Sequence, residues 1–83
     1  MYSLIFDNKA IEFPEKCEKK LGKRIWNKIQ ITKTNPYKFF ERLTGRTDYK
    51  LRIGDYRVIA DINTLKKEIN ITLIGHRKNV YRK

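Results

Sequence analysis

The sequence has little of the residues on which many enzyme sites are built. It contains one cysteine, one histidine and one serine, which are Cys17, His76 and Ser3. A single cysteine excludes an internal disulfide, and one cysteine with one histidine cannot supply the ligands of a structural zinc site. The lone serine lies in an expected first strand, so the sequence gives no support for a Ser-His-Asp hydrolase.

Acidic residues are also scarce, and those present are scattered along the chain. A divalent-metal nuclease built on clustered carboxylates is therefore disfavoured, and we expect neither a metal nor another cofactor. No glycine-rich phosphate loop is present. No run approaches the roughly 18 apolar residues of a membrane span, and the start of the chain has no signal-peptide pattern. We therefore expect a soluble, cytoplasmic protein without a membrane partner.

Basic residues dominate instead. There are 20 Lys and Arg against 9 Asp and Glu, which gives a formal net charge of +11. A charge of this size favours nucleic acid, a ribonucleoprotein or another strongly acidic partner. The alternative is that the lysines only keep a small protein soluble.

The chain of 83 residues is expected to form one domain, 1–83. Residues 1–6 predict a strand, and residues 8–20 a helix that Pro14 either kinks or restarts. A second helix follows, with a lysine-rich outer face that is either solvated or a supporting phosphate contact, and it ends before Pro36. The expected inward positions of the two helices are Ala10, Ile11, Cys17, Leu21, Ile25, Trp26 and Ile29.

Three strands are expected in the second half of the chain, at 49–53, 56–62 and 68–74. They form an antiparallel meander on which the helices pack. The fold class is therefore α+β, with two N-terminal helices on a small antiparallel sheet in the order β-α-α-β-β-β.

The first two of these strands form the most informative hairpin. Gly54 and Asp55 supply a two-residue turn, with glycine first as a type II′ turn requires. Such a turn pairs Ile53 with Tyr56 and Arg52 with Arg57. Like charges directly opposite each other destabilise a sheet by roughly 0.2–1 kcal/mol. This arrangement therefore favours a sheet that meets a polyanion.

A cluster of Lys, Arg and Tyr is suited to one reaction, the cleavage of an RNA phosphodiester by the strand's own 2′-hydroxyl. The reaction needs a base for the hydroxyl, an acid for the 5′-oxygen and cations around the phosphorane. Arginine supplies fixed charge, and a lysine among like charges loses its proton more readily. A tyrosine can donate a proton or stack on a base.

Residues 49–59, YKLRIGDYRVI, and 74–83, IGHRKNVYRK, resemble the RelE/ParE superfamily of toxins from type II toxin–antitoxin systems, on its RelE side. The resemblance covers essentially the whole chain and rests on the ordered combination, since no short motif is highly specific. It implies a ribosome-dependent endoribonuclease that cleaves mRNA in the A site without metal and inhibits translation. The implied partners are the ribosome, mRNA and a RelB-like antitoxin, acidic and helical, that wraps the toxin in a hetero-oligomer.

By position, the resemblance implies a set of catalytic residues, namely Lys50, Arg52, Arg57, Arg77 and Tyr81. The residues implied to contact RNA are Lys50, Arg52, Arg57, His76, Arg77, Lys78 and Arg82. The simpler reading of these residues is a solvated sheet face, with Tyr81 anchoring the end of the chain. The chain ends two residues after Tyr81, so we expect no terminal helix like that of some relatives.

Two positions leave the chemistry open. Arg52 stands where well-studied relatives carry lysine, and arginine stays protonated in proteins, so Lys50 is the alternative base. His76 lies beside Arg77 and is either an acid or base or a structural residue. Two rival functions also remain, a ParE-like inhibitor of DNA gyrase and a non-catalytic domain that binds RNA or the ribosome.

Overall fold

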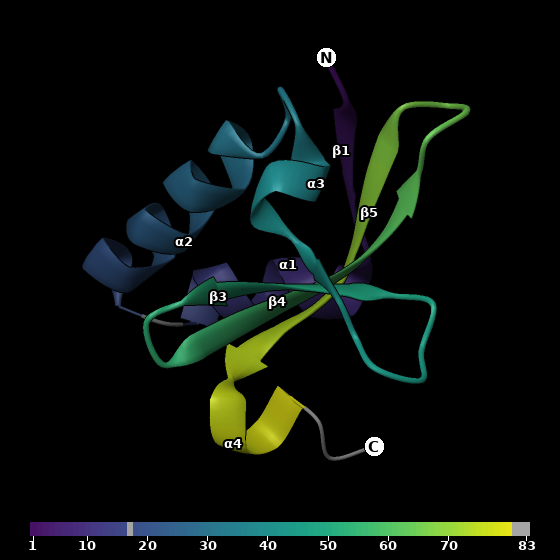
Figure 1. The fold of residues 1–83 in the computed structure, drawn as a ribbon. Coiled ribbons are helices and arrows are strands. Elements are labelled where there is room, and N and C mark those ends of the chain that lie inside the picture. The colour runs from purple at the N-terminus through teal and green to yellow at the C-terminus, as the bar shows by residue number, and fades with distance from the viewer. Residues whose placement is uncertain (17, 81–83) are drawn as a thin grey trace.

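The computed structural model describes residues 1–16 and 18–80 and has an α+β architecture (Figure 1). Its elements are β1 (Ser3–Phe6), α1 (Asn8–Lys16), α2 (Lys19–Ile31), α3 (Pro36–Phe39), β2 (Glu41–Arg42), β3 (Tyr49–Ile53), β4 (Tyr56–Asn63), β5 (Glu68–His76) and α4 (Arg77–Val80). The predicted order of one strand, two helices and three strands is confirmed. Three short elements, α3, β2 and α4, add to this order, and α4 ends before Tyr81.

The single helix expected over residues 8–20 is divided between α1 and α2. Helix α1 contains Pro14 and ends at Lys16, and α2 begins at Lys19. Proline lacks the N–H that an interior helical position donates, so the chain restarts a helix soon after it. None of the helices in the described ranges is long and apolar enough to cross a membrane.

The strands form a single sheet in the order β1-β5-β4-β3-β2. β3, β4 and β5 form the predicted antiparallel meander. β1 joins β5 in parallel, with Leu4 opposite Ile69, so the sheet as a whole is mixed. A β-bulge interrupts the β4–β5 ladder, where the hydroxyl of Thr72 donates to the carbonyl of Ile59 at 3.2 Å. Bulges increase the local twist of a sheet.

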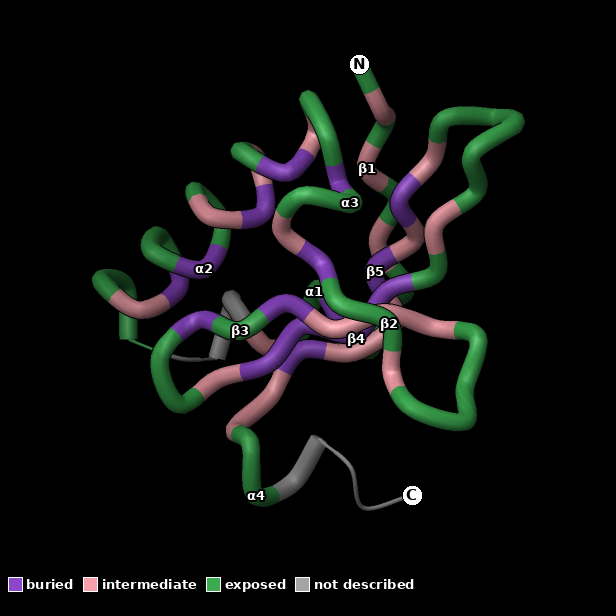
Figure 2. Tube along the Cα trace, viewed as in Figure 1, coloured by how far each residue is buried: buried purple, intermediate pink, exposed green. Residues whose placement is uncertain are grey.

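The core lies between one face of this sheet and the helices α1 and α2. Figure 2 shows buried residues along the inner side of α2 and through the central strands. Ala10 of α1 and Ile25 and Ile29 of α2 are fully buried there, against apolar residues of β3, β4 and β5. Positions 25 and 29 are one helical turn apart, so they meet the sheet together.

Two of the expected inward positions are wrong. Ile11 is 45% exposed and Trp26 is 44% exposed. Trp26 lies at the flank of the buried stripe of α2 and stacks on Phe6 of β1, with ring centroids 5.3 Å apart. Its contact with Phe6 leaves nearly half of the residue facing solvent. Cys17, another expected inward position, lies outside the described residues.

Candidate functional site

The β3–β4 hairpin has the predicted register. Ile53 pairs with Tyr56, and Arg52 pairs with Arg57. Gly54 has a φ of +58°, whereas Asp55 is outside the left-handed region. A positive φ at the first turn residue alone is the pattern of a type II′ turn, and it excludes type I′.

Alternation along the hairpin separates an apolar face from a basic one. Leu51 and Ile53 are buried against the core, while Lys50 and Arg52 point to the other face of the sheet. Ile53 and Tyr56 flank the turn as the hydrogen-bonded pair, so the next pair out, Arg52 and Arg57, is not hydrogen-bonded through its backbone. Side chains lie closest at such positions, with Cα atoms about 4.5 Å apart.

Arg57 is a buried cation held by backbone dipoles. Only 7% of its surface is exposed. Its Nη1 donates to the carbonyl oxygens of Gly54 and Tyr56, both at 2.9 Å. Within residues 1–16 and 18–80 the one ion pair is Arg46–Asp48, in the turn before β3, so no described carboxylate neutralises Arg57. A buried charge without a counter-ion is costly, and the two carbonyls satisfy only part of the guanidinium.

Lys50 and Arg52 open onto a recess at the edge of β3. Two further lysines line this recess, Lys28 of α2 and Lys38 of α3, together with Phe39 and Glu41. The Nζ atoms of Lys28 and Lys38 lie 5.6 and 5.8 Å from the centre of the Phe39 ring. The structure therefore places two more lysines, from distant parts of the sequence, beside Lys50 and Arg52, and it also places Glu41 directly opposite Lys50 in the β2–β3 ladder.

The residues after β5 divide into two groups. Arg77 and Lys78 are exposed at the start of α4, and the backbone N–H of Arg77 donates to the carbonyl of Asp55 at 2.8 Å. This bond brings α4 beside the turn of the hairpin. Tyr81 and Arg82, predicted to be catalytic and RNA-binding, lie outside the described residues.

His76 is separated from the basic face. It pairs with Tyr56, which points to the face covered by the helices and contacts Phe13 of α1. The His76 ring meets the Tyr56 ring edge-on, with centroids 5.4 Å apart, and its Nδ1 accepts the backbone N–H of Lys78 at 3.2 Å. Both contacts are those of a residue that holds α4 against the sheet.

Sequence reasoning missed Lys28, Lys38 and Phe39 as neighbours of the site. Helical periodicity marks Lys28 as an outward position, but it does not show which strand lies beside that position. Lys38 and Phe39 belong to a single helical turn without a periodic pattern. A free strand edge beside a basic helix face depends on tertiary packing, so no local sequence pattern predicts it.

Comparison with known proteins identifies the class. The family model described as ParE toxin of type II toxin-antitoxin system, parDE, matches residues 4–81. The chain belongs to this family and is a toxin of the type II toxin–antitoxin systems, within the RelE/ParE superfamily, as the sequence predicted. No curated protein sequence is detectably similar.

Solved structures show the same fold. The archaeal RelE–RelB complex from Pyrococcus horikoshii OT3 matches with a TM-score of 0.79 and 26% identity over 95% of this chain and 98% of that one. The RelBE2 toxin–antitoxin complex from Mycobacterium tuberculosis gives a TM-score of 0.80 at 18% identity, covering 92% and 98% of the two chains. The intact E. coli RelBE complex gives 0.78 at 20% identity, covering 92% and 96%.

Proposed function

We propose that this toxin is a ribosome-dependent endoribonuclease that cleaves mRNA in the ribosomal A site and so inhibits translation. The observation that carries the proposal is Arg57, a buried cation that two carbonyls fix directly opposite Arg52. The pair destabilises the sheet on its own, and it suits the phosphorane that forms when an RNA phosphodiester is cleaved.

The proposed reaction proceeds without metal. The 2′-oxygen attacks the adjacent phosphorus while its proton passes to a base, and the 5′-oxygen leaves with a proton from an acid. Arg52 and Arg57 stabilise the charge that develops on the phosphorane, because preorganised donors act most strongly where charge appears. We assign the base to Lys50, since arginine does not give up its proton. Tyr81 is the proposed acid, and Arg77, beside the turn, contacts the strand.

The proposed partners in the cell are the ribosome, mRNA and an antitoxin. The three similar structures are all complexes of a toxin with its antitoxin. A formal net charge of +11 favours an acidic antitoxin. We propose a helical, RelB-like antitoxin that wraps the toxin, covers the basic face of β3 and β4, and forms a hetero-oligomer with it.

One observation favours a second function, the inhibition of DNA gyrase. The matching family model carries the ParE name, and ParE-type toxins are the gyrase poisons of the superfamily. That activity does not require the Arg52–Arg57 pair. A domain that binds RNA or the ribosome without cleaving it would use the same basic residues only to hold phosphate.

Induced expression of the wild-type toxin and of Arg57→Ala separates these functions. The proposed activity predicts that the wild type stops incorporation of labelled amino acids within minutes while plasmid supercoiling is unchanged. Folded Arg57→Ala protein is expected to leave both amino-acid incorporation and supercoiling unchanged. Loss of supercoiling with continued protein synthesis would contradict the proposal and favour gyrase. Arrested synthesis with intact mRNA would favour the non-catalytic binding domain.

A further inference from the structure

A second basic surface lies beside the candidate site, between α2 and β3. β2 pairs only with Tyr49 and Lys50, so within residues 1–16 and 18–80 the rest of β3 has an open edge. Between this edge and the outer side of α2 is an open groove of about 600 Å³. We call it the α2 groove, and its polar lining comes from Lys20, Lys23, Arg24, Asn27, Lys28 and Arg52. None of its lining residues is acidic.

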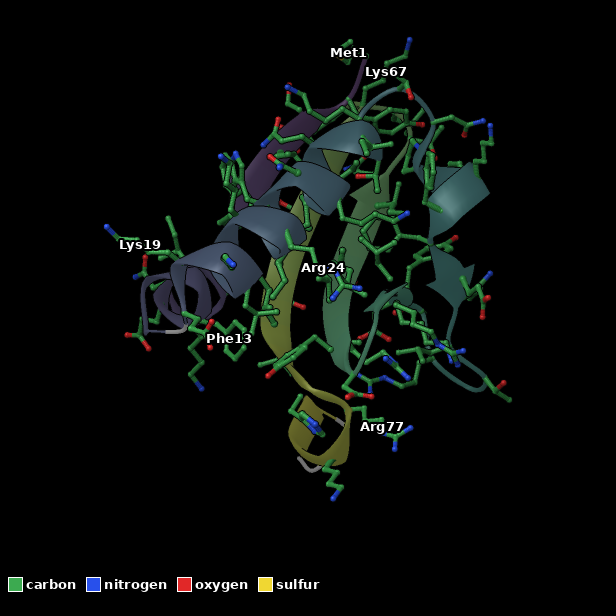
Figure 3. All side chains as sticks on the ribbon, turned by 90° about the vertical axis from the view of Figure 1, so that its left-hand side faces the viewer. Met1, Phe13, Lys19, Arg24, Lys67 and Arg77 are labelled. Carbon is green, nitrogen blue, oxygen red and sulfur yellow. The ribbon has the colours of Figure 1, made fainter. Side chains whose placement is uncertain are left out.

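Arg24 joins the two walls of the α2 groove. Figure 3 shows its side chain reaching from α2 toward the β3–β4 hairpin. A Cβ placed on Gly54 would lie 3.3 Å from the Arg24 Nη2 atom, so the guanidinium sits directly over the turn. Gly54 therefore has two roles in the hairpin, because it adopts the positive φ of the turn and, without a side chain, leaves room for Arg24.

The α2 groove is continuous with the candidate site. Lys28 and Arg52 line both the groove and the recess that contains Lys50. Phe39 lies at this junction, with the Nζ atoms of Lys28 and Lys38 at 5.6 and 5.8 Å from the centre of its ring. A row of cations thus runs from the start of α2 to the proposed catalytic residues. Basic groups beside an aromatic ring are the usual surface for single-stranded RNA.

We propose that the α2 groove binds the phosphate backbone of an RNA strand and holds it next to Lys50 and Arg52. This role rests on the proposed function for the strand to be RNA. An acidic peptide is the less suitable occupant, because the groove offers a single exposed apolar side chain for anchoring. This is Ile31, which is 51% exposed, whereas Ile53 is 4% exposed. The cations of the groove instead recur along α2 with the helical pitch of about 5.4 Å, as a row suited to successive phosphates.

The test measures binding of a fluorescein-labelled 20-nucleotide single-stranded RNA to the full chain by anisotropy, over a range of salt concentrations. The groove variant is the triple substitution Lys20→Gln, Lys23→Gln and Lys28→Gln. Its matched control is Lys9→Gln, Lys66→Gln and Lys67→Gln, which removes the same charge from exposed residues outside the groove. A fluorescein-labelled polyglutamate peptide is the second probe, and circular dichroism shows whether each variant is folded.

We expect the groove variant to bind RNA at least ten-fold more weakly and to flatten the dependence of log K on log salt by about two, since each phosphate contact on a single strand contributes roughly 0.7. The control variant is expected to change binding less than three-fold. Equal losses in both variants, or a groove variant that binds like the wild type, would overturn the proposal. A groove that binds polyglutamate more tightly than RNA would overturn it in favour of an acidic protein partner.

Binding and cleavage are measured separately, so the two proposals fail separately. If the wild-type protein leaves mRNA intact, and RNA binding is lost in the groove variant but not in the control variant, the proposed endonuclease is contradicted. The proposal for the α2 groove is then upheld.

Discussion

Arg52 and Arg57 occupy directly opposite positions of the β3–β4 ladder, and Arg57 is almost fully buried there. Two backbone carbonyls satisfy part of the Arg57 guanidinium, and neither arginine has an acidic partner among the described residues. The hairpin thus carries an electrostatic cost in the free protein that a bound anion would remove. Strain of this kind is typical of functional sites.

The first prediction separates stability from function at Arg52. Arg52→Thr removes one of two opposed charges and introduces a residue with high β propensity. We expect the free energy of unfolding to rise by roughly 0.2–1 kcal/mol, while toxicity is lost. Chemical denaturation and growth assays measure the two effects. Arg42→Thr on β2, which faces Tyr49 and not a second cation, is the control and is expected to leave toxicity unchanged. A destabilised Arg52→Thr would contradict the account of the opposed pair.

The second prediction concerns the fixed geometry of Arg57. Arg57→Lys keeps the positive charge but loses the planar group whose Nη1 bonds two carbonyls at once. We expect cleavage to slow by about 10²–10³-fold, the usual effect of removing one preorganised donor. Single-turnover cleavage on programmed ribosomes measures the rate. Near-normal cleavage by Arg57→Lys would mean that charge alone matters at this position.

The third prediction tests the close approach of Arg24 to the turn. Both glycines have a positive φ, which destabilises an alanine at either position, and the φ of Gly45 is +71°. At Gly54 the added Cβ would also contact Arg24, whereas no atom lies within 4 Å of a Cβ added at Gly45. A left-handed conformation alone costs roughly 1–2 kcal/mol in a residue other than glycine. We expect Gly54→Ala to be the more destabilising of the two in thermal unfolding. Arg24→Ala should recover part of the difference when combined with Gly54→Ala, and no recovery would refute the contact.

The fourth prediction distinguishes a structural His76 from a catalytic one. His76→Asn retains a side-chain acceptor for the N–H of Lys78, whereas His76→Leu does not. If His76 only holds α4, the asparagine variant keeps most of its cleavage rate and the leucine variant loses stability. Equal, severe loss of cleavage in both variants, with normal unfolding curves, would show that the imidazole takes part in proton transfer.

The hairpin could be predicted from the sequence to the level of individual pairs. A two-residue turn leaves a single register, and strict alternation assigns each side chain to a face. The burial of Arg57 could not be predicted in this way, because alternation says which face a residue is on but not what covers that face. The inward prediction for Trp26 was wrong for a related reason, since Trp26 lies beside the buried stripe of α2 and, among the described residues, its ring stacks on Phe6 alone.

Features that join distant parts of the chain could not be predicted from the sequence pattern. The parallel pairing of β1 with β5 joins residues that are more than sixty positions apart, such as Leu4 and Ile69. β2 is a strand of two residues, too short for any alternation to appear. The α2 groove combines a helix face with a free strand edge, so it depends on how the elements pack, which periodicity does not report.

The most direct test of the central claim is primer extension on a reporter mRNA in a reconstituted translation system, with and without the purified toxin. The same mRNA without ribosomes and the Arg57→Ala protein serve as controls. The account predicts reproducible breaks inside codons at the ribosomal A site with the wild-type protein, and none in either control. Full-length mRNA in every reaction, with a wild-type protein shown to be folded and to stop growth, would contradict the assignment as a ribosome-dependent endoribonuclease.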